Sequence, residues 1–137
     1  MNIEIKPIPE IDFLQLCNLY SIMSRQLSIP QPNSISIHTL TNDLYTRRDF
    51  IAMGVYKKGE LKGFTCGYAI SSTIFYFSGI YLKTNKKYLK ELIETSFKTI
   101  KDKGYSKWEA DANNANMSSI LAKYKSVPLF TKYQGEL

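Results

Sequence analysis

The sequence predicts an α/β (α+β) domain built on one mixed, mostly antiparallel sheet, with elements in the order β-α-α-β-β-β-α-β-α-β. Three β-rich runs between residues 50 and 83 are joined by short polar turns, which predicts an antiparallel meander. Residues 86–103 then form a strongly amphipathic segment, and a helix that connects a meander to a further strand makes the sheet mixed. A chain of 137 residues has the size of one domain, so we expect a single domain over residues 1–137.

The N-terminal third predicts one strand and two helices. Residues 2–8 alternate between apolar and polar side chains, as a half-buried strand does. Residues 11–27 carry apolar side chains at three- and four-residue spacing, which is typical of an amphipathic helix, and Pro30 and Pro32 interrupt it. A second helix is predicted at about 36–48. The apolar positions are Phe13, Leu16, Cys17, Tyr20, Met23 and Leu27 on the first helix, and Ile37, Leu40 and Leu44 on the second.

The meander and the C-terminal part complete the predicted fold. The meander strands are residues 50–57, 61–71 and 74–83, with turns at Lys58-Gly59 and at residues 71–73. Helix 86–103 should bury one face and end at Gly104 as a C-cap. The buried residues of that helix are predicted to be Leu89, Leu92, Ile93, Phe97 and Ile100. The remaining elements are predicted to be a strand at 106–112, a short helix from Asn113 to about Tyr124, and a final strand at 127–137.

Charge and composition narrow the class of partner. The net charge is +6, and lysine outnumbers arginine by 15 to 3, a bias that an A/T-rich genome, such as that of a phage or mobile element, would produce. A basic surface favours anionic partners, namely a phosphorylated cofactor, nucleic acid or an acidic protein. The absence of a recognised motif and the scarcity of arginine disfavour nucleic acid.

The sequence also bears on the cellular location of the protein and on whether it binds a metal. No apolar run approaches the roughly 20 residues that span a bilayer, and the N-terminus lacks a signal-peptide layout. We therefore expect a cytoplasmic protein, or alternatively a virion component, without a membrane partner. Cys17 and Cys66 show no motif spacing and are expected to be free thiols. With His38 as the only histidine, no metal site is expected.

The C-terminal half resembles the cofactor-binding core of the GNAT superfamily of N-acetyltransferases. The residues that carry the resemblance are Gly79-Ile-Tyr-Leu before a helix, then Lys103-Gly104-Tyr105, Lys107-Trp-Glu-Ala-Asp111, an Asn-rich stretch and a short helix ending in Tyr124. Residues 64–71 and 74–83 resemble the central hairpin of the family, and the order of elements extends the resemblance over essentially the whole chain. The resemblance implies an acyltransferase that moves acetyl from acetyl-CoA to a primary amine.

The resemblance also assigns a cofactor site. Backbone groups of Ile80 to Leu82 would pair with the pantetheine arm of acetyl-CoA. Members of the family that bind acetyl-CoA usually carry an Arg or Gln followed by a glycine-rich loop, whose glycines let backbone N–H groups approach the pyrophosphate. Residues 83–89 lack both glycines, so lysines would hold the phosphates as point charges. The residues assigned to the cofactor are Ile80, Tyr81, Leu82, Lys83, Lys86, Lys87 and Asn116.

The missing glycines leave a second hypothesis open. A short loop of this kind also fits a domain that kept the fold and lost the cofactor, serving as a catalytically silent binding or structural protein. An open anion site at residues 83–89 would favour the enzyme. A site filled by Tyr88 or Leu89 would favour the silent protein.

Four side chains are candidates for the chemistry of amine acetylation. The family often uses a tyrosine of the last helix as the acid that protonates the departing thiolate, which implies this role for Tyr124; packing in the core is the alternative. Glu109 and Asp111 share one strand face, so either could be the base if that face lines the cleft, and Asp111, near the end of the strand, is the preferred one. Tyr76 and Ser78 would act as a base or position water. Alternation along the strand predicts Tyr76, Ser78 and Ile80 on one face, with Phe75, Phe77 and Gly79 on the other. His38 is a further possible base, beside the loop where the acceptor usually approaches in the family.

Overall fold

The computed structural model describes residues 3–25, 33–83, 87–111, 122, 124, 126–129 and 132–137. Over these residues the chain forms a seven-stranded sheet in the order β1-β2-β3-β4-β5-β7-β6. All neighbouring strands are antiparallel except β4 and β5, which are parallel. The sheet is therefore mixed and mostly antiparallel, as predicted. The strands are β1 (Ile3–Pro7), β2 (Ile51–Lys57), β3 (Glu60–Ala69), β4 (Ile74–Leu82), β5 (Lys107–Asp111), β6 (Ser126–Leu129) and β7 (Lys132–Glu136).

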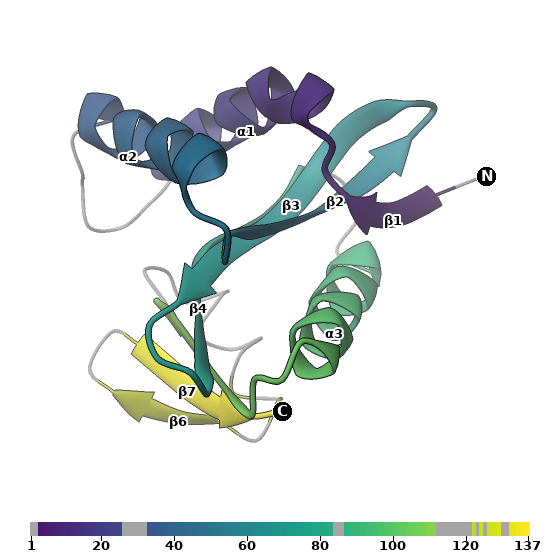
Figure 1. Ribbon diagram of the computed structural model, residues 1–137. Helices are drawn as coiled ribbons and strands as arrows, with labels where there is room; N and C mark the ends of the chain where they lie inside the picture. The colour runs from purple at the N-terminus through teal and green to yellow at the C-terminus, as the bar shows by residue number, and fades with distance from the viewer. Residues whose placement is uncertain are drawn as a thin grey trace.

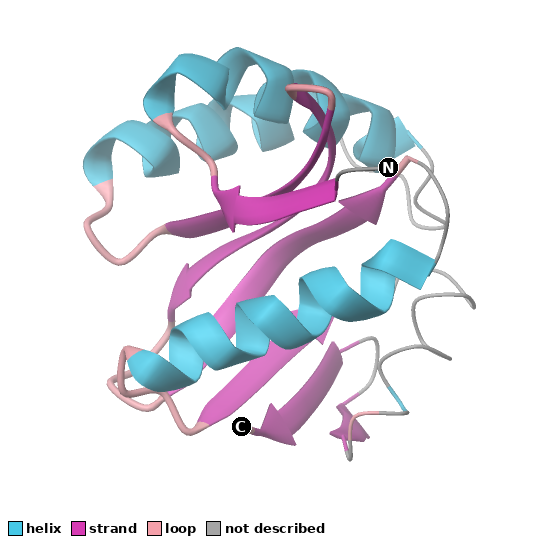
Figure 2. Cartoon of the chain, turned by 90° about the vertical axis from the view of Figure 1, so that its right-hand side faces the viewer, coloured by secondary structure: helices cyan, strands magenta, loops and turns pink. Residues whose placement is uncertain are grey.

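Helices cover both faces of the sheet, with two on one side and one on the other (Figures 1 and 2). On one side α1 packs against α2 and lies over β3 and β4. On the other side α3 lies across β2, β3 and β4. None of the helices in the described part of the chain is long and apolar enough to cross a membrane. The helices are the 3₁₀ turn η1 (Glu10–Asp12), α1 (Phe13–Arg25), α2 (Asn33–Thr46) and α3 (Lys87–Asp102).

Helix α3 is anchored to the sheet as its apolar stripe predicts. Leu89, Leu92, Ile93 and Ile100 are buried. Phe97 is only half-buried, so the prediction of its burial is wrong, although its ring stacks on that of Trp108 with centroids 5.1 Å apart. The backbone N–H of Tyr105 donates to Ile100 O and that of Gly104 to Lys101 O, an arrangement that ends a helix at a glycine. Gly104 has a φ of 104°, a value that favours glycine. The predicted C-cap is therefore confirmed.

The C-terminal segment differs from its prediction. A single strand was predicted at residues 127–137, but β6 and β7 are separate strands that pair with each other antiparallel. Alternation of side chains does not reveal where a chain reverses, and residues 130–131 (Phe-Thr) carry none of the glycine, asparagine or proline that mark a turn. The helix predicted at 113–124 lies outside the described residues, apart from positions 122 and 124.

Candidate active site at the fork between β4 and β5

The parallel strands β4 and β5 separate part way along the sheet and form a fork. They pair from Ile74 and Lys107 as far as Phe77 and Ala110. Beyond this point β4 continues to Leu82, whereas the last residue of β5 pairs only with β7. In the described part of the chain, the rest of β4 has no partner strand on that side. Its backbone N–H and C=O groups can therefore bond to an extended ligand as a further strand would.

A β-bulge lies at the start of the fork. Cys66 of β3 pairs with Gly79 and Gly67 pairs with Phe77, so Ser78 is an extra residue in β4. A bulge bends its strand and increases the local twist, which is consistent with the divergence of β4 from β5 at this point. The Ser78 hydroxyl faces β3, where its Oγ lies 3.6 Å from Cys66 Sγ and 3.5 Å from the Cys66 carbonyl oxygen.

The bulge also overturns the predicted faces of β4. Ile80 packs with both clusters beneath α3, one of which contains Phe75 and Phe77, and not on the face of Tyr76 and Ser78. A Cβ at Gly79 would contact Phe64, Tyr20 and Cys66, which belong to the α1 side. The extra residue resets the alternation of the strand, so the prediction fails from residue 79 onward. Of the residues assigned to the pantetheine arm, Ile80 and Leu82 therefore face α3 and Tyr81 faces α1.

A row of side chains crosses the sheet just before the fork, on the face that carries α1 and α2. The strand registers pair Tyr68 with Tyr76, Tyr76 with Glu109, and Glu109 with Gln134. The rings of Tyr68 and Tyr76 meet edge to face with centroids 5.5 Å apart, and Phe50 stacks on Tyr68 at 6.5 Å. Gln134 Nε2 donates to Glu109 Oε2 at 2.9 Å. We call these five half-buried residues the cross-strand row.

Arg47, which follows α2, contacts this row from one side. Its guanidinium carbon lies 4.1 Å from the centroid of the Tyr68 ring. It also donates to both carboxylate oxygens of Asp49, at 2.8 and 2.7 Å, and to the carbonyl oxygen of Ala69 at 3.1 Å. The hydrogen bonds from Arg47 lower the pKa of Asp49. Asp49 thus compensates the charge of Arg47 within the site.

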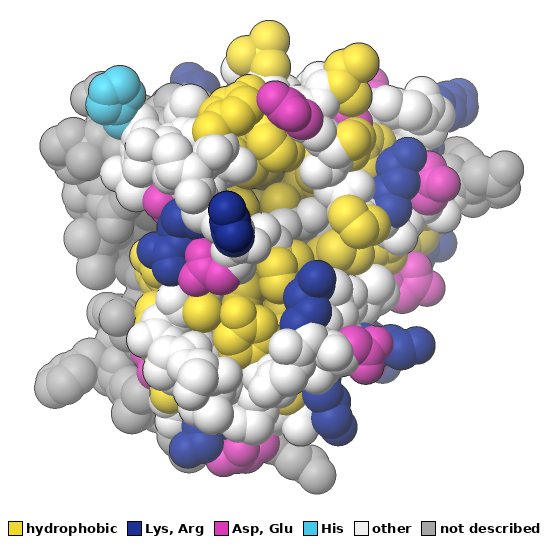
Figure 3. All heavy atoms as spheres, in the orientation of Figure 1, with side chains coloured by type: hydrophobic (Ala, Val, Ile, Leu, Met, Phe, Trp, Pro, Cys, Tyr) yellow, Lys and Arg dark blue, Asp and Glu magenta, His cyan; other side chains and the backbone are white. Residues whose placement is uncertain are grey.

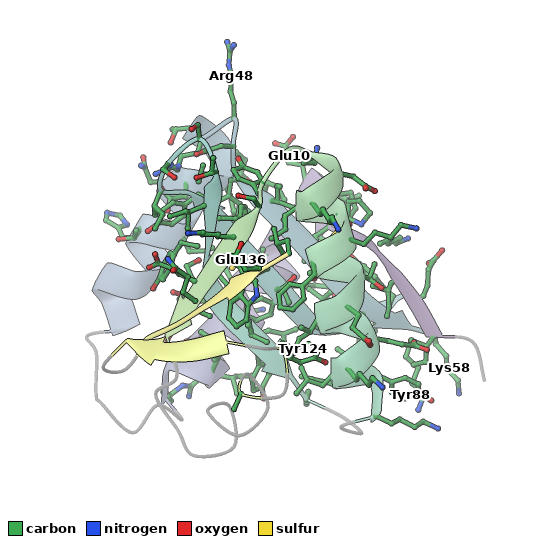
Figure 4. All side chains as sticks on the ribbon, turned by 90° about the horizontal axis from the view of Figure 1, so that it is seen from below. Glu10, Arg48, Lys58, Tyr88, Tyr124 and Glu136 are labelled. Carbon is green, nitrogen blue, oxygen red and sulfur yellow. The ribbon has the colours of Figure 1, made fainter. Side chains whose placement is uncertain are left out.

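Tyr124 lies on the opposite face of the sheet, beside α3 (Figure 4). Its half-buried ring meets that of Phe97 edge to face, with centroids 5.4 Å apart. Burial, and to a smaller extent the charge of Glu94, raise the pKa of Tyr124. The structure therefore does not bring Tyr124 and Tyr76 together on one face, because α3 and the cross-strand row lie on opposite sides of the sheet.

The junction between β4 and α3 carries the predicted phosphate lysines. Lys83 and Lys87 are exposed, and the backbone N–H of Lys83 donates to Lys62 O at 2.9 Å. Lys87 Nζ lies 4.9 Å above the ring centroid of Tyr88, in the first turn of α3. A helix N-terminus attracts anions, and α3 has no acidic residue in its first turn. Leu89 belongs to the core beneath α3.

The other predicted site residues fall outside this arrangement or are only partly described. The backbone of Asp111 ends β5 at the fork and pairs with Lys132 of β7. Lys86 and Asn116 lie outside the described residues, and His38 is exposed on α2. Tyr68, Gln134 and Arg47 were not identified from the sequence. They meet Tyr76 and Glu109 only through strand register and the packing of the α2 end, for which no local sequence pattern exists.

The molecule has the fold of the GNAT N-acetyltransferases. Over 100% of both chains it superposes on the PaiA N-acetyltransferase of Thermoplasma acidophilum, solved in complex with coenzyme A, with a TM-score of 0.75 and 17% identity. An N-acetyltransferase of Staphylococcus aureus Mu50 gives a TM-score of 0.73 at 16% identity over 99% of each chain. An acetyl transferase of Salmonella typhimurium, which modifies the N-terminal serine of ribosomal protein L7/L12, gives 0.68 at 11% identity over 100% of this chain and 96% of its own.

Sequence comparison adds no closer relationship. No protein-family model matches the chain, and no curated protein matches it in sequence. The structural similarity, at these low identities, shows the fold alone.

Proposed function

We propose that this protein transfers an acyl group, in the first place acetyl, from acetyl-CoA to a primary amine. The observation that carries the proposal is the fork, which leaves one edge of β4 from Ser78 to Leu82 without a strand partner in the described residues. An edge of this kind can pair with the amide groups of a pantetheine arm. The fold is that of enzymes that perform this transfer, and the solved PaiA N-acetyltransferase holds coenzyme A.

The two faces of the sheet would divide the chemistry of the reaction. A thioester that enters the fork lies between the α3 face, which carries Tyr124, and the opposite face, which carries Tyr76 and Ser78. Attack by the amine expels the coenzyme as a thiolate, and Tyr124 would supply a proton to that sulfur. Deprotonation of the amine falls to a base or water, with Tyr76 and Ser78 as the candidates on the other face and Asp111 as a further candidate from the sequence.

The phosphates of the cofactor would lie at the junction of β4 and α3. Exposed Lys83 and Lys87 flank the helix N-terminus, and Lys86 lies between them in the sequence. Calorimetric titration with acetyl-CoA tests this placement. The variant in which Lys83, Lys86 and Lys87 are all alanine should bind more weakly, and the loss should be larger at low salt because exposed charges are screened by ions.

A matched control removes the same charge from the other end of α3. Lys98, Lys101 and Lys103 are exposed there, and their replacement by alanine should leave the affinity close to that of the parent. Equal losses in both triple variants would indicate an effect of net charge and contradict the placement. No binding by the parent at millimolar acetyl-CoA would overturn the enzyme proposal.

The second candidate is that the protein is catalytically silent and serves as a binding or structural protein. It would keep the same fold and bind an acidic protein partner. The absence of glycine from residues 83–89 favours it, because those glycines normally let the backbone approach the pyrophosphate. The same titration separates the two candidates. A cytoplasmic location, a virion location and a phage origin remain predictions from composition.

A further inference from the structure

We propose that the cross-strand row binds the acceptor as an ammonium cation oriented by the carboxylate of Glu109. The acceptor class that fits is a primary amine with no carboxylate on the carbon that bears the nitrogen. This inference rests on the proposed function, since the amine is the second substrate of that reaction.

The cross-strand row lies next to the fork, where the acceptor must be held to reach the thioester. Tyr76 and Glu109 form the register pair directly before Phe77 and Ala110, the last pair before β4 and β5 separate. One residue of a strand advances the chain by about 3.3 Å, so this pair lies next to the start of the fork. An amine held there would stand beside a thioester that occupies the fork.

Glu109 has the charge and the orientation that an ammonium group needs. Its carboxylate is half-buried and accepts a hydrogen bond of 2.9 Å from the neutral amide of Gln134. None of the ion pairs found among the described residues involves Glu109, although the protein carries a net charge of +6. A partly desolvated carboxylate that no cation among the described residues compensates attracts a cationic ligand more strongly than a fully solvated one does.

The aromatic residues of the row complete the preference for a cation. The ring of Tyr76 lies beside Glu109 in the register, and Tyr68 lies one strand further away, with the Arg47 guanidinium 4.1 Å from its centroid. Tyrosine faces attract cations, and they also contact the methylene groups of an alkylamine. The row therefore offers a carboxylate for the nitrogen and rings for the carbon chain.

The negative charge of Glu109 disfavours an amino acid as the acceptor. A carboxylate on the carbon next to the nitrogen would approach Glu109, and like charges placed together are a source of selectivity against the wrong ligand. Arg47 does not offset this repulsion, because its guanidinium already donates to Asp49 and Ala69.

Two probe amines test this selectivity on the full chain. Butylamine and norvaline differ by a carboxylate on the carbon that bears the nitrogen. Their binding is measured by calorimetry, both with and without coenzyme A. We expect butylamine to bind at least about tenfold more tightly than norvaline. A ratio of this size corresponds to the free energy of roughly one charged hydrogen bond.

The Glu109→Gln variant identifies the residue responsible. It keeps the shape of the side chain and a hydrogen-bonding partner for Gln134, so thermal unfolding should change little. Its affinity for butylamine should fall about tenfold, whereas coenzyme A binding should be unchanged. Glu136→Gln is the matched control, because Glu136 lies on the same face of β7 two residues beyond Gln134, is exposed, and pairs in register with Lys107. It should leave both affinities as they are.

The outcomes separate this inference from the proposed function. Equal binding of the two amines, tighter binding of norvaline, or the same butylamine affinity in Glu109→Gln and the parent would overturn the inference, even if coenzyme A binds. Butylamine binding that depends on Glu109, in a protein that does not bind coenzyme A, would support the cation site and overturn the acetyltransferase.

Discussion

Burial controls the titration of individual side chains on both faces of the sheet. It raises the pKa of Tyr124 on the α3 side, and on the α1 side it raises the pKa of the Cys66 thiol to about 12. Both groups therefore keep their protons at neutral pH. Tyr124 can then act as a proton donor, whereas the fully buried Cys66 is expected to be unreactive, since the thiolate is the nucleophilic form.

The Tyr124→Phe variant tests the proton donor. It keeps the ring that packs on Phe97 and removes only the hydroxyl. General-acid assistance is typically worth about 10²–10⁴-fold, so turnover should fall by at least roughly tenfold while the free energy of unfolding barely changes. Acetyl transfer and chemical denaturation are measured on the same variant. Unchanged turnover would assign Tyr124 to the core, where any loss of stability should stay near about 1–3 kcal/mol for an orphaned hydrogen-bond partner.

Cys66 makes the stability of the protein depend on pH. Its pKa rises from 9.0 to about 12 on folding, chiefly because burial disfavours the thiolate. The contribution of the protonated Cys66 thiol to the free energy of unfolding is therefore fully present below pH 9 and is lost as the pH rises toward 12. Between pH 8 and 10 the free energy of unfolding should decrease by roughly 1 kcal/mol from this group.

Cys66→Ala should remove that part of the pH dependence, measured by denaturant titration at both pH values. Cys17→Ala is the control, because Cys17 is only half-buried, and this variant should keep the slope of the parent. An unchanged slope in Cys66→Ala would contradict the prediction.

Among the elements, α3 shows how a helix can be placed from sequence. Its apolar residues recur at helical spacing, and four of the five predicted ones are buried. Ser96 was not predicted, yet it is buried and its hydroxyl lies 2.6 Å from that of Thr65 on β3. A polar residue on an apolar stripe is buried when the sheet offers a partner, and the helix sequence alone does not show that partner.

Leu92→Ala tests the packing of α3. Leu92 has 0% of its surface exposed, so the substitution should lower the free energy of unfolding by about 2–5 kcal/mol, the cost of a cavity in a close-packed core. Lys90→Ala, on the exposed side of the same helix, should change it little. Chemical denaturation measures both, and a loss under about 0.5 kcal/mol for Leu92→Ala would show that α3 is not part of the core.

Strand β4 shows the limit of the same reasoning. Alternation predicts its faces correctly as far as Ser78 and wrongly from Gly79 to Ile80, because a bulge inserts one residue. Gly67 and Gly79 lie at this bulge, and a glycine inside a strand is compatible with one, but the glycines alone do not show which residue is the extra one. The bulge depends on how β3 pairs with β4, and it lies where the proposed thioester would bind.

At the scale of the whole molecule, the C-terminal hairpin of β6 and β7 makes a very close contact with the core at Gly135. Gly135 of β7 pairs with Trp108 of β5, and a Cβ at Gly135 would overlap the indole of Trp108. Trp108 is fully buried and is the only tryptophan. The hairpin can therefore complete the sheet only while residue 135 has no side chain.

Gly135→Ala should thus destabilise the protein. Overpacking typically costs about 1–3 kcal/mol, and a fully buried indole has little room to shift. Denaturation followed by the fluorescence of Trp108 measures the loss. Glu136→Ala, at the exposed neighbouring position, should stay close to the parent. Equal stability of Gly135→Ala and the parent would show that β7 does not press on Trp108.

Charges over the whole surface bear on the choice of ligand. On the face shown in Figure 3, basic and acidic side chains are interspersed among the described residues around a central apolar region. The net charge of +6 is therefore not gathered into a single basic surface on that face. This arrangement agrees with local anion binding at the β4–α3 junction and a local cation site at Glu109.

The sequence by itself determined the order of the elements as far as β5, the mixed sheet and the helix across it. These features depend on periodicity, turns and caps, which are properties of neighbouring residues along the chain. The same information located Tyr76, Ser78 and Tyr124 as candidates. Strand register, the bulge and the reversal before β7 were decided by the tertiary structure. They depend on contacts between segments far apart in the sequence, and only those contacts bring Tyr68, Tyr76, Glu109 and Gln134 into one row.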